Sequence, residues 1–132
     1  MSQKNLDTMR AAIDAFNRRD GEGFDAHLAE DAKIVPVRSA LEGTVYRGSD
    51  AATQYCIAVD ASWENLVWEV EEMRDDESWV LALGRIRGRG RGSGAVIDAR
   101  GAWLARFQDG LVTHFRTYPD RAEALRAVGL EE

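Results

Sequence analysis

The chain has 132 residues, of which 45% are hydrophobic, and its formal net charge is −6. This length fits one domain with a proper core, and the acidic balance argues against general nucleic-acid binding. No apolar run approaches the roughly 20 residues of a membrane helix, and the N-terminus carries no apolar signal core. The single cysteine, Cys56, can form no internal disulfide, and no Cys/His cluster suggests zinc. We therefore expect a cytoplasmic protein without metal, cofactor, membrane contact or nucleic-acid partner.

The first half of the chain is predicted to be mostly helical. Residues 5–19 carry apolar side chains at spacings of three and four, which predicts one apolar helix face, and Gly21 ends this helix. A second short helix is expected over residues 22–29, followed by a strand over 32–37. A third helix is expected over 51–60, with Ser49 or Asp50 as its N-cap.

The second half is predicted to be a series of antiparallel strands. Apolar residues alternate with polar ones from Leu66 to Val70, the period of a strand. Further strands are expected over residues 79–91, 95–107 and 111–118, separated by a Gly-rich hairpin and an Asp-Gly turn. A short helix over 120–128 stops at Gly129, and no linker or repeat divides the chain.

This order of elements resembles that of SnoaL-like proteins, a family of the nuclear transport factor 2 superfamily. The resemblance covers nearly the whole chain, and its most similar stretches are residues 16–21, 28–32, 88–94, 107–110 and 118–125. It implies an α+β fold, in which a curved, mostly antiparallel sheet wraps around N-terminal helices as a cone-shaped α+β barrel. Residues 1–132 would form this single domain, with a small-molecule pocket inside the cone.

Strand alternation then divides the side chains between the inner and the outer face of the cone. The residues expected inside are Leu66, Trp68, Val70, Val80, Ala82, Gly84, Ile86, Ala99, Gly101, Trp103, Ala105, Phe107, Thr113, Phe115 and Thr117. An apolar pocket with few polar atoms is typical of small-molecule sites. We expect its ligand-contacting residues to be Ile34, Pro36, Tyr55, Trp68, Val70, Ile86, Trp103, Phe107, Phe115 and Thr117. The alternative is that these aromatic rings only fill the cone.

The resemblance does not assign catalytic residues. Ketosteroid isomerases carry a carboxylate base on the strand that here reads Ile34-Val35-Pro36-Val37. Limonene epoxide hydrolases use an Arg and two Asp at positions that here align with Gly84, Ile86 and Thr117. The chain could be an isomerase, cyclase or hydrolase, or no enzyme. His27, His114, Asp31 and Asp98 are expected outside the pocket.

Alternating arginines run along one predicted strand, at Arg85, Arg87, Arg89 and Arg91. They resemble an Arg-Gly RNA-binding segment, but on a strand they share one face with Glu69, Glu71 and Asp98 of neighbouring strands. Cross-strand pairs of opposite charge are ordinary in sheets. We therefore interpret the arginines as partners in ion pairs.

The outer face also carries apolar residues, which predicts an interface between two copies of the chain. Trp79, Leu81, Leu83, Leu104 and Val112 are expected there. The sequence thus predicts a homodimer through Leu81, Leu83, Leu104 and His114. Two functions stay open: a protein that binds an apolar small molecule in the cone, and a non-catalytic dimeric module whose cone is filled by its own side chains.

Overall fold

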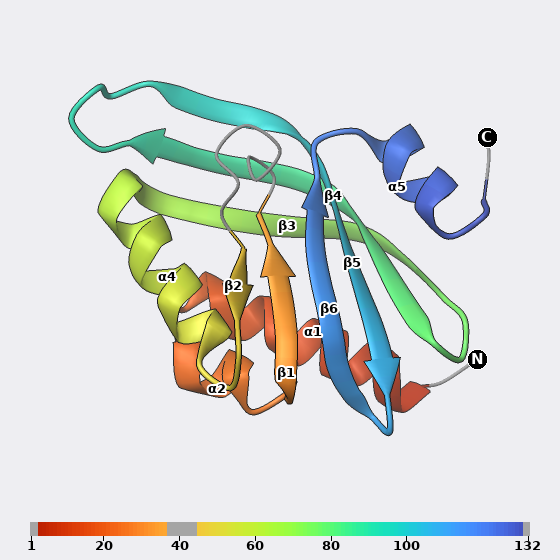
Figure 1. Cartoon of the computed structure of the whole chain (residues 1–132). Helices are drawn as coiled ribbons and strands as arrows, with labels where there is room; N and C mark the ends of the chain where they lie inside the picture. Colours follow the sequence, from red (N-terminus) through yellow and green to blue (C-terminus); the bar gives the residue numbers. More distant parts are fainter. Residues whose placement is uncertain (1–2, 37–44, 131–132) are drawn as a thin grey trace.

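The computed structural model describes residues 3–36 and 45–130. Figure 1 shows a curved sheet with helices against it. In chain order the elements are α1 (Gln3–Asn17), α2 (Gly21–Asp25), β1 (Leu28–Val35), β2 (Tyr46–Arg47), α4 (Ala51–Ser62), β3 (Trp63–Asp75), β4 (Trp79–Gly90), β5 (Val96–Gln108), β6 (Leu111–Tyr118) and α5 (Arg121–Ala127). The sheet order is β2-β1-β6-β5-β4-β3, antiparallel except where β1 runs parallel to β6. The predicted α+β cone is confirmed. Among the described residues, no helix is both long and apolar enough to cross a membrane.

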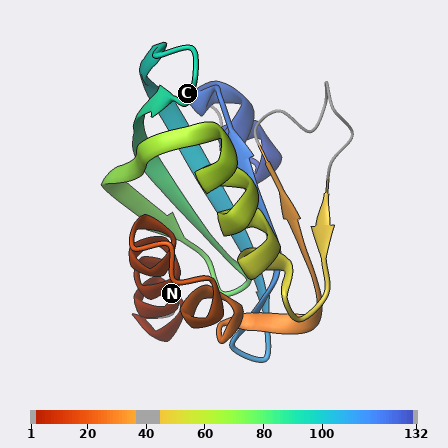
Figure 2. The same cartoon turned by 90° about the vertical axis from the view of Figure 1, so that its left-hand side faces the viewer.

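The helices lie on two sides of the sheet. Figure 2 shows α4 and α1 within the curve of the sheet, and α5 on the opposite side. The buried apolar residues accordingly form two clusters. The inner cluster joins α1, α2, α4 and the concave face of the sheet, and it contains Phe16, Trp68, Trp103 and Phe115. The outer cluster joins β4, β5, β6 and α5.

The outer cluster corrects the predicted surface on the outer face. Leu81, Leu83 and Leu104 are buried, because Ala124 and Leu125 of α5 pack over them. Asp120 caps α5 by accepting a hydrogen bond from the backbone N–H of Ala122 at 2.8 Å. These leucines are thus covered within a single chain, and the expectation that they form an exposed apolar surface is wrong.

A bulge between β5 and β6 places two residues of β6 on other faces than those predicted. Arg106 pairs with His114, whereas Phe107 pairs with Val112, so one residue of β6 has no opposite partner at this point. Val112 consequently joins the inner cluster, although it was expected outside. Thr113 is the extra residue, and its hydroxyl donates to the Arg106 carbonyl rather than lying inside. One inserted residue reverses the faces on either side of it.

The N-terminal boundaries also differ from those predicted. The second helix is shorter, and β1 begins already at Leu28, because the backbone N–H of Val112 in β6 donates to the His27 carbonyl at 2.9 Å. Asp31, expected outside the pocket, is an exposed residue of β1. Val37, the last residue of the predicted strand, lies outside the described residues.

Arg85 and Arg87 of β4 lie on the outer face, as interpreted from the sequence, whereas Arg91 was wrongly placed in the same row: it follows β4 and donates to the Asp60 carbonyl of α4. Arg85 contacts Asp98 at 2.8 Å, and Arg87 contacts Glu69 at 3.0 Å. Hydrogen bonds from Arg85 lower the pKa of the Asp98 carboxyl below its usual range. The intervening Ile86 belongs to the inner cluster.

A glycine allows β3 and β4 to approach each other closely beside this arginine row. The β3–β4 pairing shifts between Val70 and Glu72, opposite Gly84. A Cβ atom on Gly84 would stand 1.8 Å from the Glu69 carbonyl oxygen. Only glycine fits where the backbone of the bulged strand passes this closely.

Candidate functional site

Three strands bring the aromatic rings of the inner cluster together. Trp68 of β3, Trp103 of β5 and Phe115 of β6 all point to the concave face, because each lies on the apolar side of its alternating strand. The ring centroids of Trp68 and Trp103 are 5.3 Å apart, and those of Trp68 and Phe115 are 5.7 Å apart. The predicted inward orientation of Trp103, next to Trp68 and Phe115, is confirmed.

Helix α1 adds a ring that was not among the predicted site residues. The Phe16 ring stacks on the Trp68 ring at a centroid distance of 3.6 Å and an interplanar angle of 7°. At the other end of the cluster, Phe24 of α2 contacts Phe115 edge to face at 5.2 Å. Both phenylalanines are fully buried. This part of the cone is therefore filled by side chains of the chain itself.

Polar groups are sparse in the interior. In the described part of the chain, the buried polar side chains other than those of the aromatic residues and Cys56 are Asn5 and Thr117. Thr117 forms a hydrogen bond with the Tyr55 hydroxyl of α4. Burial raises the pKa of Tyr55 far above its usual value, and the Thr117 hydrogen bond offsets only part of that rise. At neutral pH Tyr55 therefore stays protonated, and it can hold a polar group of a ligand but not remove a proton from it.

One buried polar atom has no partner among the described residues. It is the indole nitrogen Nε1 of Trp103, whose side chain is 0% exposed. Buried donors are nearly always paired, and leaving one unpaired costs free energy. Among the described residues of the inner face, Trp103 Nε1 is thus the buried side-chain donor without a hydrogen-bond acceptor.

The inner face opens toward solvent near the β4–β5 hairpin. There it is formed by a group that we call the hairpin ledge: Ile86, Gly88, Ile97, Ala99 and Gly101. Ala99 is exposed and Ile97 is half-buried, whereas Trp103 and Ala105 further along the same strand are buried. The ledge is an apolar part of the inner sheet face that remains partly exposed to solvent.

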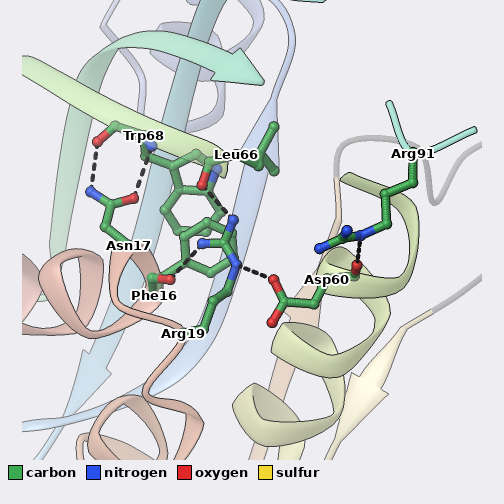
Figure 3. A network of polar contacts seen from close by, with 7 residues as sticks. All are labelled: Phe16, Asn17, Arg19, Asp60, Leu66, Trp68 and Arg91. Atoms are coloured by element: carbon green, nitrogen blue, oxygen red, sulfur yellow. Dashed lines mark hydrogen bonds and ion pairs between the residues drawn. The ribbon is translucent and has the colours of Figure 1, made fainter. Parts of the chain in front are cut away.

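The last residue of α1 forms hydrogen bonds with the free edge of the sheet at Trp68. β3 is an edge strand, so its outward backbone groups lack a neighbouring strand. The Asn17 amide takes over this role by donating to the Trp68 carbonyl and accepting from the Trp68 N–H, both at 2.9 Å (Figure 3).

Arg19 joins three elements at the same place (Figure 3). Its guanidinium donates to the Phe16 carbonyl at 2.7 Å, to the Asp60 carboxylate of α4 at 2.9 Å, and to the Leu66 carbonyl of β3. It also lies 4.7 Å from the centre of the Phe16 ring. Arg91 binds the backbone carbonyl of Asp60 from the other side. The C-terminal end of α4 is thereby fixed against α1 and β3.

A hollow lies between α2 and α4. It has a volume of about 260 Å³ and is lined by Arg19, Asp20, Gly21, Glu22, Thr53, Cys56, Ile57 and Asp60. At the edge of this hollow, the Asp25 carboxylate accepts hydrogen bonds from the backbone N–H groups of Ala52 and Thr53 at 2.7 and 3.2 Å. In this lining Asp20 accepts from the backbone N–H of Gly23 at 2.9 Å, and Arg19 pairs with Asp60 at 2.9 Å.

The thiol in this hollow should react slowly. Burial raises the pKa of Cys56 to about 11, and the nearby Arg19 charge lowers it only in part. At pH 8 we expect its reaction with a disulfide reagent to be about a hundredfold slower than that of an unperturbed thiol, because thiolate is scarce. The rate should keep rising tenfold per pH unit beyond pH 9. Spectrophotometric labelling of the native protein measures the reaction rate at each pH, with the guanidinium-unfolded chain as control. A rate that stops rising near pH 9 would contradict the raised pKa of Cys56.

The structure gathers most of the predicted pocket residues in one place. Those in the inner cluster or packed against it are Ile34, Tyr55, Trp68, Val70, Ile86, Trp103, Phe107 and Phe115. Thr117 contacts this cluster through its hydrogen bond with Tyr55. Pro36 is half-buried at the end of β1. Their contact with a ligand stays a prediction. Phe16, Asn17 and Arg19 were missed, although the spacing of the first helix had already placed Phe16 on its apolar face.

The side chains weighed for catalysis lie away from the rings. His114 is exposed on the outer face, His27 is half-buried in the turn before β1, and Asp98 is paired with Arg85. In the described ranges, 3–36 and 45–130, no Asp, Glu, His, Lys or Arg is buried. The inner face can therefore bind through apolar contact and a few hydrogen bonds, and its described residues supply no charged acid or base.

Comparison with known proteins defines the class of this fold. Over residues 9–115 the chain matches the SnoaL-like domain, and it belongs to that family. A nuclear transport factor 2-like protein of unknown function from Burkholderia pseudomallei has 25% identity and a TM-score of 0.79, over 98% of this chain and 99% of its own. A comparison with curated proteins found no match.

Two further solved structures share the fold at lower identity. A protein assigned as a polyketide cyclase from Xanthomonas campestris pv. campestris has 20% identity and a TM-score of 0.76, over 96% of this chain and 98% of its own. TerC, co-crystallised with polyporic acid, has 16% identity and a TM-score of 0.77, over 89% of this chain and 92% of its own. At these identities the similarity shows the fold alone.

Proposed function

We propose that this chain binds a small, predominantly apolar molecule on the concave face of its sheet, at the hairpin ledge. The observation that carries the proposal is the exposure of Ala99 on a face that is otherwise apolar and buried further along β5. Concave, apolar surfaces with a few polar groups are the usual form of small-molecule sites. Membership of the SnoaL-like family, with a protein assigned as a polyketide cyclase and a polyporic acid complex among proteins of this fold, supports a ligand in the cone.

The proposal is tested with N-phenyl-1-naphthylamine, a neutral dye that fluoresces in apolar surroundings. We expect saturable binding that also changes tryptophan fluorescence, because Trp103 lies directly behind the ledge. Ala99→Glu should weaken binding about tenfold or more, since it places a carboxylate on the apolar surface. The matched control is Ala122→Glu, on an exposed position of α5 across the sheet, and it should change nothing.

Salt provides a second arm of this test. The ledge carries no charge, so the affinity should stay nearly constant between about 0.05 and 0.5 M salt. A steep fall in affinity with rising salt would contradict the proposal. It would instead indicate binding near Arg85 and Arg87 on the outer face. Equal effects of the two glutamate variants would also contradict it.

A second candidate function is a non-catalytic module whose cone is filled by its own side chains. The close stacking of Phe16 on Trp68 favours it. In that case the dye does not bind at the ledge, and the chain acts through its surface as a homodimer, visible in light scattering as twice 14.7 kDa. Because α5 covers Leu81, Leu83 and Leu104, such a dimer would use the charged part of the outer face or require α5 to move.

A further inference from the structure

The unpaired Nε1 atom of Trp103 lies next to the hairpin ledge. Trp103 Cζ2, the ring carbon on the Nε1 side of the indole, is 3.5 Å from the point where a Gly101 Cβ would stand. The indole edge that carries the N–H group therefore faces Gly101 and the ledge. An orphan donor that is fully buried beside an exposed apolar surface requires a partner from outside the described residues.

The side chain of Ile86 lies beside Gly101, at the strand position opposite the exposed Ala99. The Cγ1 and Cδ1 atoms of Ile86 stand 2.8 Å from the missing Gly101 Cβ, so Ile86 occupies the space that the glycine leaves. Ile86 is directly opposite Ala99 in the β4–β5 pairing. A rotation of the Ile86 side chain would connect the surface at Ala99 with the indole edge without moving either strand.

We infer that the ligand carries a hydrogen-bond acceptor, such as a carbonyl oxygen, which Trp103 Nε1–H binds, and that Ile86 is the side chain displaced on entry. This inference rests on the proposed function, to which it adds the chemical class of the ligand. A pure hydrocarbon would leave the indole donor unpaired, whereas a ketone or quinone oxygen would satisfy it. The remaining contacts of the ligand are apolar, from Ala99 and Gly101.

The test compares two probes of nearly equal size, 2-acetylnaphthalene and 2-ethylnaphthalene, which differ in one carbonyl oxygen. Binding is followed through the indole N–H signals of ¹⁵N-labelled protein, where each of the four tryptophans gives one signal. Trp103→Phe identifies the Trp103 signal by its loss. Trp79→Phe is the matched control, because Trp79 packs on the outer cluster.

We expect the ketone to move the Trp103 N–H signal downfield, and the hydrocarbon to leave it nearly in place. The preference for the ketone over the hydrocarbon should fall about fivefold in Trp103→Phe and stay unchanged in Trp79→Phe. Ile86→Ala should strengthen the binding of both probes, because it clears the path and leaves the donor in place.

Each negative result has a separate meaning. If both probes bind at the ledge with the same preference in wild type and in Trp103→Phe, the hydrogen-bond inference is overturned and the proposed function stands. If Ile86→Ala weakens both probes, the role of Ile86 as the displaced side chain is wrong. If neither probe binds to wild type or to Ile86→Ala, the proposed function fails, and the inference fails with it.

Discussion

Replacing Phe16 by alanine should lower the free energy of unfolding by about 3–5 kcal/mol, the usual cost of removing a fully buried phenylalanine. The ring is 0% exposed and stacks on Trp68 at 3.6 Å, and it also contacts Tyr55 at 5.5 Å. Its loss leaves a cavity at the centre of the inner cluster and removes the surface on which the Arg19 guanidinium lies. Urea unfolding followed by circular dichroism measures the change.

Leu111→Ala is the control for this experiment. Leu111 is 41% exposed at the start of β6, so its truncation should change stability by no more than about 0.5 kcal/mol. Phe16→Ala also tests how the cone uses its interior, because an apolar cavity of that size can stay dry and accept a small aromatic molecule. A loss below about 1 kcal/mol would show that the ring is not packed as the structure has it.

Gly84→Ala should be nearly as damaging, although it adds only one methyl group. The new Cβ would stand 1.8 Å from the Glu69 carbonyl oxygen and 2.8 Å from its carbonyl carbon. Backbone cannot rotate aside as a side chain can, so the bulge of β3 would have to separate from β4. We expect a loss of about 3 kcal/mol or more, measured by the same urea unfolding.

The residue directly opposite provides a closely matched control. Gly101 pairs with Gly84 across β4 and β5, and the same substitution there meets the Ile86 side chain at 2.8 Å, with Trp103 Cζ2 at an ordinary contact distance of 3.5 Å. Because Ile86 can change its rotamer, Gly101→Ala should cost only about 1 kcal/mol. Equal losses at the two glycines would mean that the close approach of β3 is not what requires glycine at position 84.

Strand alternation was sufficient to predict the inner face of the cone. Trp68, Trp103 and Phe115 each lie in a strand whose other face carries charged residues, among them Glu69, Arg106 and Arg116, so the alternation favours turning the rings inward. The same argument failed in β6, where the face of Val112 depends on a bulge. An extra residue at Thr113 is a property of the pairing between two strands, and the sequence of either strand alone carries no sign of it.

Other features depended on how separate elements meet. The helix after β6 was predicted, but its sequence does not show against which surface it packs. Leu81 and Leu83 were therefore expected on an exposed apolar surface. Asn17 and Arg19 looked like the ordinary polar end of a helix. Their partners, the backbone groups of Trp68 and Leu66, become visible only once β3 is known to be an edge strand.

The parallel pairing of β1 with β6 has a consequence for the order in which the chain folds. β3 to β6 are joined by short turns and can pair locally, whereas Ile34 of β1 must find Phe115 of β6 across most of the chain. Contacts so distant in sequence form slowly, because a long loop must first be closed. During synthesis on a ribosome, β1 and β2 would wait for the last strand to emerge. Until then α2 would expose Phe24, whose ring packs against Phe115 of β6, and this exposed apolar surface makes the nascent chain prone to aggregation in that interval.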